Sequence, residues 1–126
     1  MLEFYFNEET VIALHKDLIE KTGGIYEIRD IGLLSSALNV PFQSFGDTEI
    51  YPTVYEKASR LAFGLIQNHA FIDGNKRIAA HIMLIFLSVN GIELCYSQEE
   101  LENLFLALAS SEITLNELTE WLKNHS

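Results

Sequence analysis

The stretch from Ile78 to Val89 constrains the fold most, because about twelve consecutive residues are apolar at nearly every position. A helix that is hydrophobic all round is buried rather than lying on the surface. The run is also shorter than the roughly twenty apolar residues that a bilayer requires. The sequence therefore predicts an all-α protein with no membrane segment, in which other helices pack around this buried central helix.

A polar stretch comes directly before the apolar run. Residues 69–77 read His-Ala-Phe-Ile-Asp-Gly-Asn-Lys-Arg, which places a base, a carboxylate, a glycine, an amide and two cations in nine residues. The first N–H groups of a helix have no partners within it, and the helix dipole adds partial positive charge there. Gly74, Asn75, Lys76 and Arg77 are therefore placed to bind an anion, for which phosphate is the natural candidate.

Capping residues and apolar spacing predict the remaining helices. The start signals are Asn7, Asp30, Thr53 with Glu56, Ser97 with Glu100, and Thr114 with Glu117. The stop signals are Gly23-Gly24, Pro41, Asn68 and, for the central helix, Asn90-Gly91. With 126 residues and no linker or repeat, the chain is expected to form one domain over residues 1–126.

The segment from Pro41 to Pro52 has no helical period. It mixes aromatic residues with a Gly-Asp turn and β-forming residues, which predicts a small β-hairpin or flap. An exposed strand edge can pair with an extended segment of another protein, so the flap is a candidate for positioning a protein substrate. A plain connecting loop explains the composition equally well. Residues 92–95 are the other candidate strand.

Charge and cysteine content narrow the classes of function. The net charge of −10 argues against DNA or RNA binding through a general positive field. Cys95 is the one cysteine, so an internal disulfide is excluded, and we expect a buried, inert thiol. The first nine residues include early acids and no basic region before an apolar one, unlike a signal peptide. A cytoplasmic protein is the resulting expectation.

Three residues of the polar stretch have distinct chemical roles. His69 can act as a general base near neutral pH, because the reference pKa of histidine is about 6.5. It would take the proton from a hydroxyl group that attacks phosphorus. Asp73 is a hard oxygen ligand suited to a Mg²⁺ ion that is shared with nucleotide phosphates. Phe71 is interpreted as the anchor that holds the loop to the core. His15, much earlier in the chain, is interpreted as a surface or partly buried structural histidine.

The last four residues of the stretch fit phosphate groups. Gly74 lets the backbone approach phosphate closely. Asn75 can cap the helix or donate its amide to a phosphate oxygen. Arg77 offers a rigid fork to phosphate, and Lys76 offers a compact mobile charge. Each residue alone has an ordinary structural explanation, so the hypothesis depends on the whole set.

The pattern His-x-Phe-x-Asp-Gly-Asn-Lys-Arg at residues 69–77 resembles the signature of the Fic/Doc family, in particular its Doc (death-on-curing) branch. The similarity covers roughly residues 10–95, including Gly23-Gly24, residues 28–34, Pro41, Tyr51-Pro52, Asn68 and Asn90-Gly91. The resemblance implies a compact, all-α Fic fold. It also implies an enzyme that transfers part of ATP, with Mg²⁺, to a hydroxyl group of a protein.

Lys76 and Gly74 bear on which part of ATP is transferred. Family members that transfer AMP have glycine at the position of Lys76, whose side chain would fill the space beside the helix start. In Doc, the lysine accompanies transfer of the γ-phosphate to a threonine of translation elongation factor Tu. The resemblance thus implies a protein kinase toxin that halts translation. Gly74 departs from this pattern, because the founding Doc has alanine there and AMP-transferring members have glycine, so AMP transfer is the alternative.

The resemblance also implies a protein partner. Members that inhibit themselves contain the pattern Ser or Thr, three residues, Glu, then Gly or Asn, and this chain has no match. Inhibition would then come from a small antitoxin whose disordered segment folds into a groove on the toxin. The acidic surface suits a basic antitoxin tail.

Two other classes of function compete with this interpretation. One is a metal-dependent phosphohydrolase that uses His69, Asp73 and His81 as ligands, although Gly74-Asn75 suits phosphate better than metal. His81 is otherwise expected to be a hydrogen-bonded core histidine. The other is a binding module that has the fold but no catalytic activity.

Overall fold

The computed structural model describes residues 6–126, which form six α-helices, one short 3₁₀ helix and one β-hairpin. The elements are α1 (Glu8–Thr22), α2 (Ile31–Asn39), η1 (Val40–Phe42), β1 (Ser44–Phe45), β2 (Thr48–Glu49), α3 (Val54–Asn68), α4 (Asn75–Val89), α5 (Gln98–Ala109) and α6 (Leu115–Asn124). The predicted all-α class with a small hairpin is confirmed.

The N-cap residues predicted from the sequence begin their helices. The side chains of Asn7, Asp30, Thr53, Ser97 and Thr114 each accept a backbone N–H group of the first turn. Ser97 and Thr114 form complete capping boxes. At Thr53 the hydroxyl accepts from the Glu56 N–H group at 3.1 Å and also donates to the Glu56 carboxylate at 2.9 Å. Local side-chain chemistry therefore sets where these helices start.

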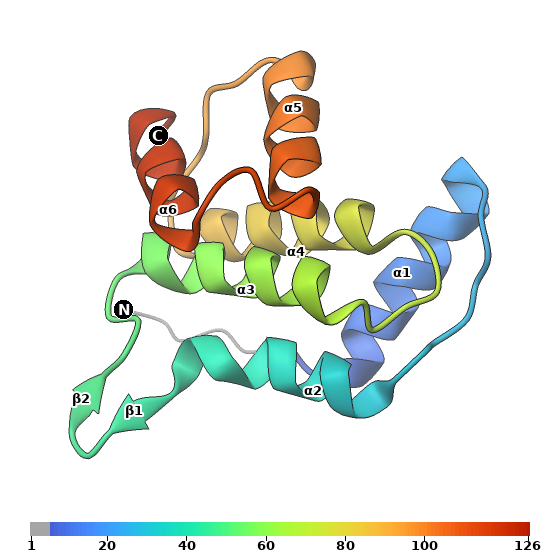
Figure 1. Ribbon diagram of the computed structural model, residues 1–126, viewed down its shortest axis with the longest axis horizontal. Helices are drawn as coiled ribbons and strands as arrows, with labels where there is room; N and C mark the ends of the chain where they lie inside the picture. The colour runs from blue at the N-terminus through green and yellow to red at the C-terminus, as the bar shows by residue number, and fades with distance from the viewer. Residues whose placement is uncertain (1–5) are drawn as a thin grey trace.

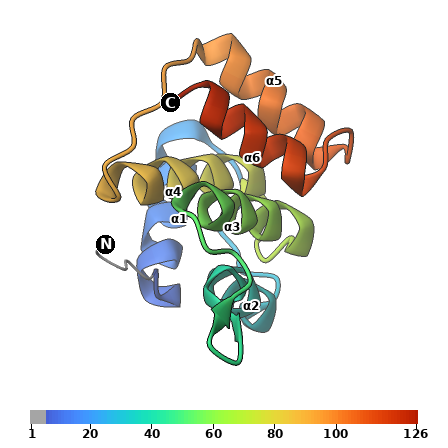
Figure 2. The same cartoon turned by 90° about the vertical axis from the view of Figure 1, so that its left-hand side faces the viewer.

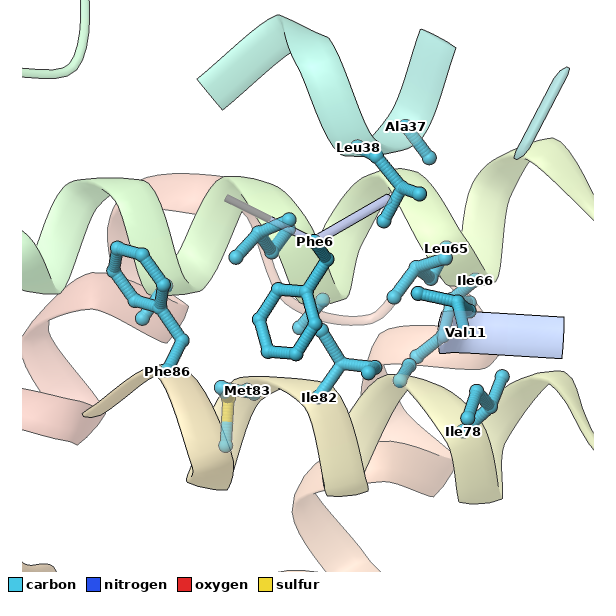
Figure 3. Packing of buried hydrophobic residues seen from close by; sticks show 14 of the residues in the cluster. Phe6, Val11, Ala37, Leu38, Leu65, Ile66, Ile78, Ile82, Met83 and Phe86 are labelled. Atoms are coloured by element: carbon cyan, nitrogen blue, oxygen red, sulfur yellow. The ribbon is translucent and has the colours of Figure 1, made fainter. Parts of the chain in front are cut away.

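Helices α3 and α4 form an antiparallel pair at the centre of the molecule. Helices α1 and α2 lie on one side of this pair, and α5 and α6 lie on the other, as two perpendicular views show (Figures 1 and 2). Ile82 and Phe86 of α4 are at most 1% exposed and point toward residues of α2 and α3, whereas Met83, which is 0% exposed, points to the other side of α4 (Figure 3). Burying each such side chain contributes about 1.5–3 kcal/mol, so the core fixes the position of α4.

Helix α4 is central but is not buried on every side. His81 and Ser88 are exposed, and they lie two turns apart on one face of the helix. The expectation that His81 is a hydrogen-bonded core histidine is therefore wrong. The sequence indicates this solvent-facing strip only weakly, because His81 and Ser88 are the two polar residues in an otherwise apolar run.

The hairpin forms where the sequence predicted it, with Ser44 opposite Glu49 and Phe45 opposite Thr48. It precedes α3, whereas the loop of residues 69–74 follows α3 (Figure 1). Fifteen helical residues span about 22 Å, so the hairpin and this loop lie at opposite ends of α3. The expectation that the hairpin positions a substrate at the polar stretch is therefore not supported by its location.

Residues 92–95 form no strand. The segment runs from α4 toward α5, and the Cys95 N–H group bonds to the main-chain oxygen of His125 at 2.6 Å. Cys95 is exposed, so the prediction of a buried thiol is wrong. Alternating residues of this single extended segment face solvent, and Cys95 falls on the outer side.

Among residues 6–126, no helix has the length and apolar character needed to cross a bilayer. The expectation that the chain begins without a signal peptide falls largely on residues 1–5, which lie outside the described residues.

Candidate active site

The polar stretch forms a loop that leaves α3 at His69 and enters α4 at Asn75. His69 has a φ of +47°, which is uncommon for a residue other than glycine. The Arg29 guanidinium stabilises this conformation by donating to the main-chain oxygens of His69 at 2.6 Å and Asn68 at 2.8 Å. The His69 ring is exposed and bonds to no group within residues 6–126. The ring is therefore accessible to a substrate hydroxyl.

Phe71 anchors the loop, as predicted. It is 1% exposed, and Asn75 bonds to both of its main-chain polar groups. The Asn75 Oδ1 accepts from the Phe71 N–H at 3.2 Å, and the Asn75 Nδ2 donates to the Phe71 oxygen at 2.8 Å. Asn75 thus closes the loop rather than capping α4, whose N-cap residue is Gly74. A contact from the Asn75 amide to phosphate stays a prediction.

The first turn of α4 has no side-chain cap. Gly74, the N-cap residue, adopts a φ of +78° and has no side chain to accept from the N–H groups of the first turn, and no other side chain among residues 6–126 takes that role. These groups point out of the helix end and are free to bind an anion. This feature supports the anion site that the sequence predicted.

Both carboxylate oxygens of Asp73 accept hydrogen bonds from backbone N–H groups. Its Oδ2 accepts from the Ile25 N–H at 3.2 Å, and its Oδ1 accepts from the Gly74 N–H at 2.8 Å. These two hydrogen bonds, with a smaller effect of the nearby Arg77 charge, lower the pKa of Asp73. The carboxylate is therefore ionised at neutral pH, as a Mg²⁺ ligand must be.

The two cations of the loop differ in their surroundings. Lys76 is exposed. Arg77 is half-buried and donates to the Thr22 hydroxyl and, at 2.9 Å, to the Gly23 main-chain oxygen, while its Nη2 lies 3.6 Å from Asp73 Oδ1. Arg77 therefore ties the end of α1 to the loop. Lys76 forms no ion pair within the described part of the chain and is the loop cation proposed to contact a ligand.

No three His, Cys, Asp or Glu side chains gather into a metal cluster within residues 6–126. His81 is exposed on α4, so the ligand set that a metal phosphohydrolase would draw from His69, Asp73 and His81 is not assembled. Mg²⁺ in nucleotide sites commonly uses one or two carboxylates together with substrate phosphates. Asp73 beside the uncapped start of α4 fits that requirement.

Sequence reasoning missed the extended segment of residues 24–29, which runs beside the loop. The Arg29 N–H bonds to the Ala70 oxygen at 2.8 Å, and the Ile72 N–H bonds to the Glu27 oxygen at 3.0 Å. Tyr26 is 45% exposed. These bonds use one edge of the segment, and its other edge faces away from the loop. The sequence signals that flank this segment are Gly23-Gly24 and residues 28–34. Both were part of the family resemblance, but neither predicted that the segment pairs with the loop.

Protonation of His15 is expected to destabilise the fold. Burial lowers the pKa of its imidazole below the reference value of about 6.5, although a hydrogen bond to Asp73 and the Asp73 charge oppose this and Arg77 adds to it. Below that pH the unfolded chain binds more protons than the folded chain. The stability contributed by neutral His15 is therefore complete above about pH 6.5 and is lost as the pH falls toward the lower folded-state pKa.

Urea unfolding tests this expectation. The free energy of unfolding of the wild-type protein should fall more between about pH 7 and pH 5 than that of His15→Gln, which lacks the titrating ring. Equal pH dependence in the two proteins would contradict it.

The fold and the loop define a class of helical proteins in which a His-x-Phe-x-Asp-Gly-Asn-Lys-Arg loop joins two central helices. Residues 5–87 match the Fic/DOC family, and the chain belongs to this family. The chain is 34% identical over 98 residues to Toxin Doc of Mycolicibacterium smegmatis, which covers 76% of this chain and 75% of that protein. It is 27% identical over 119 residues to Protein kinase doc of Escherichia phage P1. This match covers 94% of this chain and 93% of that protein. The family resemblance seen in the sequence is confirmed.

Proposed function

We propose that this protein is the toxin of a toxin-antitoxin pair and that it transfers the γ-phosphate of ATP to a hydroxyl group of a protein. The observation that supports this most is the uncapped start of α4 with the exposed Lys76 in its first turn. The similarity to a toxin and to a protein kinase agrees with it.

In the proposed reaction, the substrate hydroxyl oxygen forms a bond to the γ-phosphorus while the bond to the β-phosphate oxygen breaks and ADP leaves. His69 accepts the hydroxyl proton. The first-turn N–H groups of α4 and Lys76 bind the phosphate oxygens. Asp73 would hold Mg²⁺, which neutralises phosphate charge when it is bound.

AMP transfer is the second candidate, and Gly74 is the residue that favours it. The structure gives this glycine a local explanation. Its φ is +78°, and an added Cβ would lie 3.0 Å from Ile19 Cδ1 and 3.3 Å from His15 Nε2. Glycine is therefore explained by backbone and packing, so its presence says little about which phosphate reacts.

A groove between α4 and α5 is the proposed site for the antitoxin segment. Its volume is about 400 Å³, and its lining residues are Lys76, Arg77, Ala80, Gln98, Leu101, Glu102, Phe105 and Leu106. An amphipathic helix could bury its apolar side on Leu101 and Phe105 and pair a carboxylate with Lys76. It would then cover the anion site. The proposal fails if no small protein encoded beside this gene binds the chain.

The edge of residues 24–29 that does not bond to the loop is the proposed site for the protein substrate. An extended peptide could add to this edge and place a hydroxyl near the exposed His69 ring. By family resemblance, that hydroxyl belongs to a threonine of elongation factor Tu. This edge replaces the distant hairpin as the candidate for positioning the substrate.

Labelled ATP tests the reaction directly. The purified protein is incubated with a cell lysate and ATP labelled at either the α or the γ position. We expect the γ label, and not the α label, to appear on a protein band, which mass spectrometry then identifies. Transfer of the α label alone would establish AMP transfer instead. Transfer of neither label would leave only a binding module.

Gly24→Ala is expected to impair the site more than the fold. Gly24 has a φ of +126°, and an added Cβ would lie 2.5 Å from Asp73 Oδ2. Gly23 has a φ of +82°, but its Cβ would meet nothing within 4 Å, so Gly23→Ala is a matched control. Backbone strain should lower the free energy of unfolding of both variants by about 1–3 kcal/mol.

Only Gly24→Ala should displace the Asp73 carboxylate. Urea unfolding and phosphate transfer are measured in parallel at a temperature where both variants are folded. The first measures the backbone strain, and the second measures the effect of displacing the Asp73 carboxylate. Similar residual transfer by the two variants would show that Gly24 does not act through Asp73.

A further inference from the structure

His15 of α1 is fully buried and lies against the loop of the candidate active site. Its side chain is 0% exposed, and its Nε2 lies 2.7 Å from the main-chain oxygen of Asp73. The ring stacks on Phe71 with centroids 3.7 Å apart and planes 12° apart. Because a carbonyl oxygen can only accept, Nε2 carries the proton and donates it to Asp73.

This tautomer leaves the other ring nitrogen as an acceptor with no donor. The Nδ1 of His15 is buried and has no hydrogen-bond partner within residues 6–126. A buried polar atom without a partner is unfavourable, and it calls for an explanation in a native structure. A leucine would fill similar space without this cost, so packing alone does not explain a histidine here. The group that histidine adds is the donor at Nε2.

We infer that His15 is a positioning residue that orients Asp73 toward the magnesium ion of the bound nucleotide. The inference rests on the proposed function, in which Asp73 is the Mg²⁺ ligand. His15 fixes the main-chain oxygen of Asp73, and the Ile25 N–H fixes its carboxylate at 3.2 Å. Together these two bonds hold both ends of the residue. Replacing a group that orients a metal ligand typically costs about 10–100-fold in metal affinity.

Calorimetric titration with ADP, with and without Mg²⁺, tests the inference on the full chain. The variants are His15→Leu, which removes the donor, and His15→Gln, whose amide can still donate. Because a Cβ added at Gly74, the N-cap of α4, would lie 3.3 Å from His15 Nε2, the affinity of each protein for ADP without Mg²⁺ is measured as its own baseline. With Mg²⁺ the wild type should bind ADP more tightly, and His15→Leu should lose about 10-fold or more of that gain. His15→Gln should retain most of it.

The outcomes separate the inference from the proposed function. If His15→Leu gains as much from Mg²⁺ as the wild type, or if His15→Gln loses as much as His15→Leu, the inference is wrong and the function is unaffected. If the wild type itself gains nothing from Mg²⁺, both are overturned.

A second measurement uses the wild type alone and does not depend on the folding of any variant. The ¹⁵N resonances of the His15 ring should shift when Mg²⁺ is added to the ADP complex, and unchanged resonances would overturn the inference.

Discussion

Replacing His69 with alanine is expected to reduce phosphate transfer to the protein target by about 10²–10⁴-fold, the usual contribution of a general base. Growth inhibition should disappear with it. His69 is exposed and its ring bonds to no group within the described residues, so its removal breaks no side-chain hydrogen bond of the fold. The measurement is transfer of the γ label by the purified variant, together with its unfolding curve.

Two companion variants control for backbone and charge. His69 adopts a φ of +47°, a conformation that asparagine tolerates, so His69→Asn keeps the loop while it removes the base. His81→Ala removes another exposed histidine from α4 and should retain full activity. An active His69→Asn protein, or an equal loss in His81→Ala, would show that His69 is not the base.

Lys76→Gly is expected to convert part of the activity from phosphate transfer to AMP transfer. Lys76 is in the first turn of α4, the turn whose N–H groups would bind phosphate. Removing it opens the space that AMP-transferring members of the family leave open. Glycine there should cost at most about 1 kcal/mol of stability, because the position is exposed and at a helix end. The measurement is the ratio of α to γ label on protein.

Lys76→Met separates the size of the side chain from its charge. Methionine keeps most of the length of lysine and lacks the charge, so it should lower γ transfer without gaining α transfer. If Lys76→Gly gains no α transfer, steric blocking by Lys76 is the wrong explanation. If Lys76→Met gains as much as Lys76→Gly, the charge rather than the volume selects the reaction.

Helix starts and the loop were predictable because their signals are local. Ser97 and Thr114 form their capping boxes with residues three positions away. The position of Phe71 two residues from both His69 and Asp73 was enough to predict an anchor. The resemblance of residues 69–77 to a known signature gave the family. In each case a short stretch of sequence contains both the groups that interact.

The support around the loop was not predictable in this way. His15 contacts Asp73 across 58 positions, and Arg29 contacts His69 across 40 positions. No periodicity or spacing in the sequence links such pairs. His15 and Asp73 meet because α1 packs against α4, which is a contact between distant parts of the chain. The hairpin was predicted correctly as a local structure. Its distance from the loop depends on the length of α3, which the flap hypothesis did not consider.

The uncapped end of α4 belongs to the same helix as Ile78, Ile82 and Met83, which are core residues with 0% exposure. A ligand that binds only the folded chain raises its free energy of unfolding by RT ln(1 + [L]/Kd). Because unravelling this helix end would loosen the centre of the bundle, occupancy should raise the melting temperature of the whole protein in a single cooperative transition. Thermal shift would therefore identify nucleotides and inhibitory peptides without any knowledge of the cellular target.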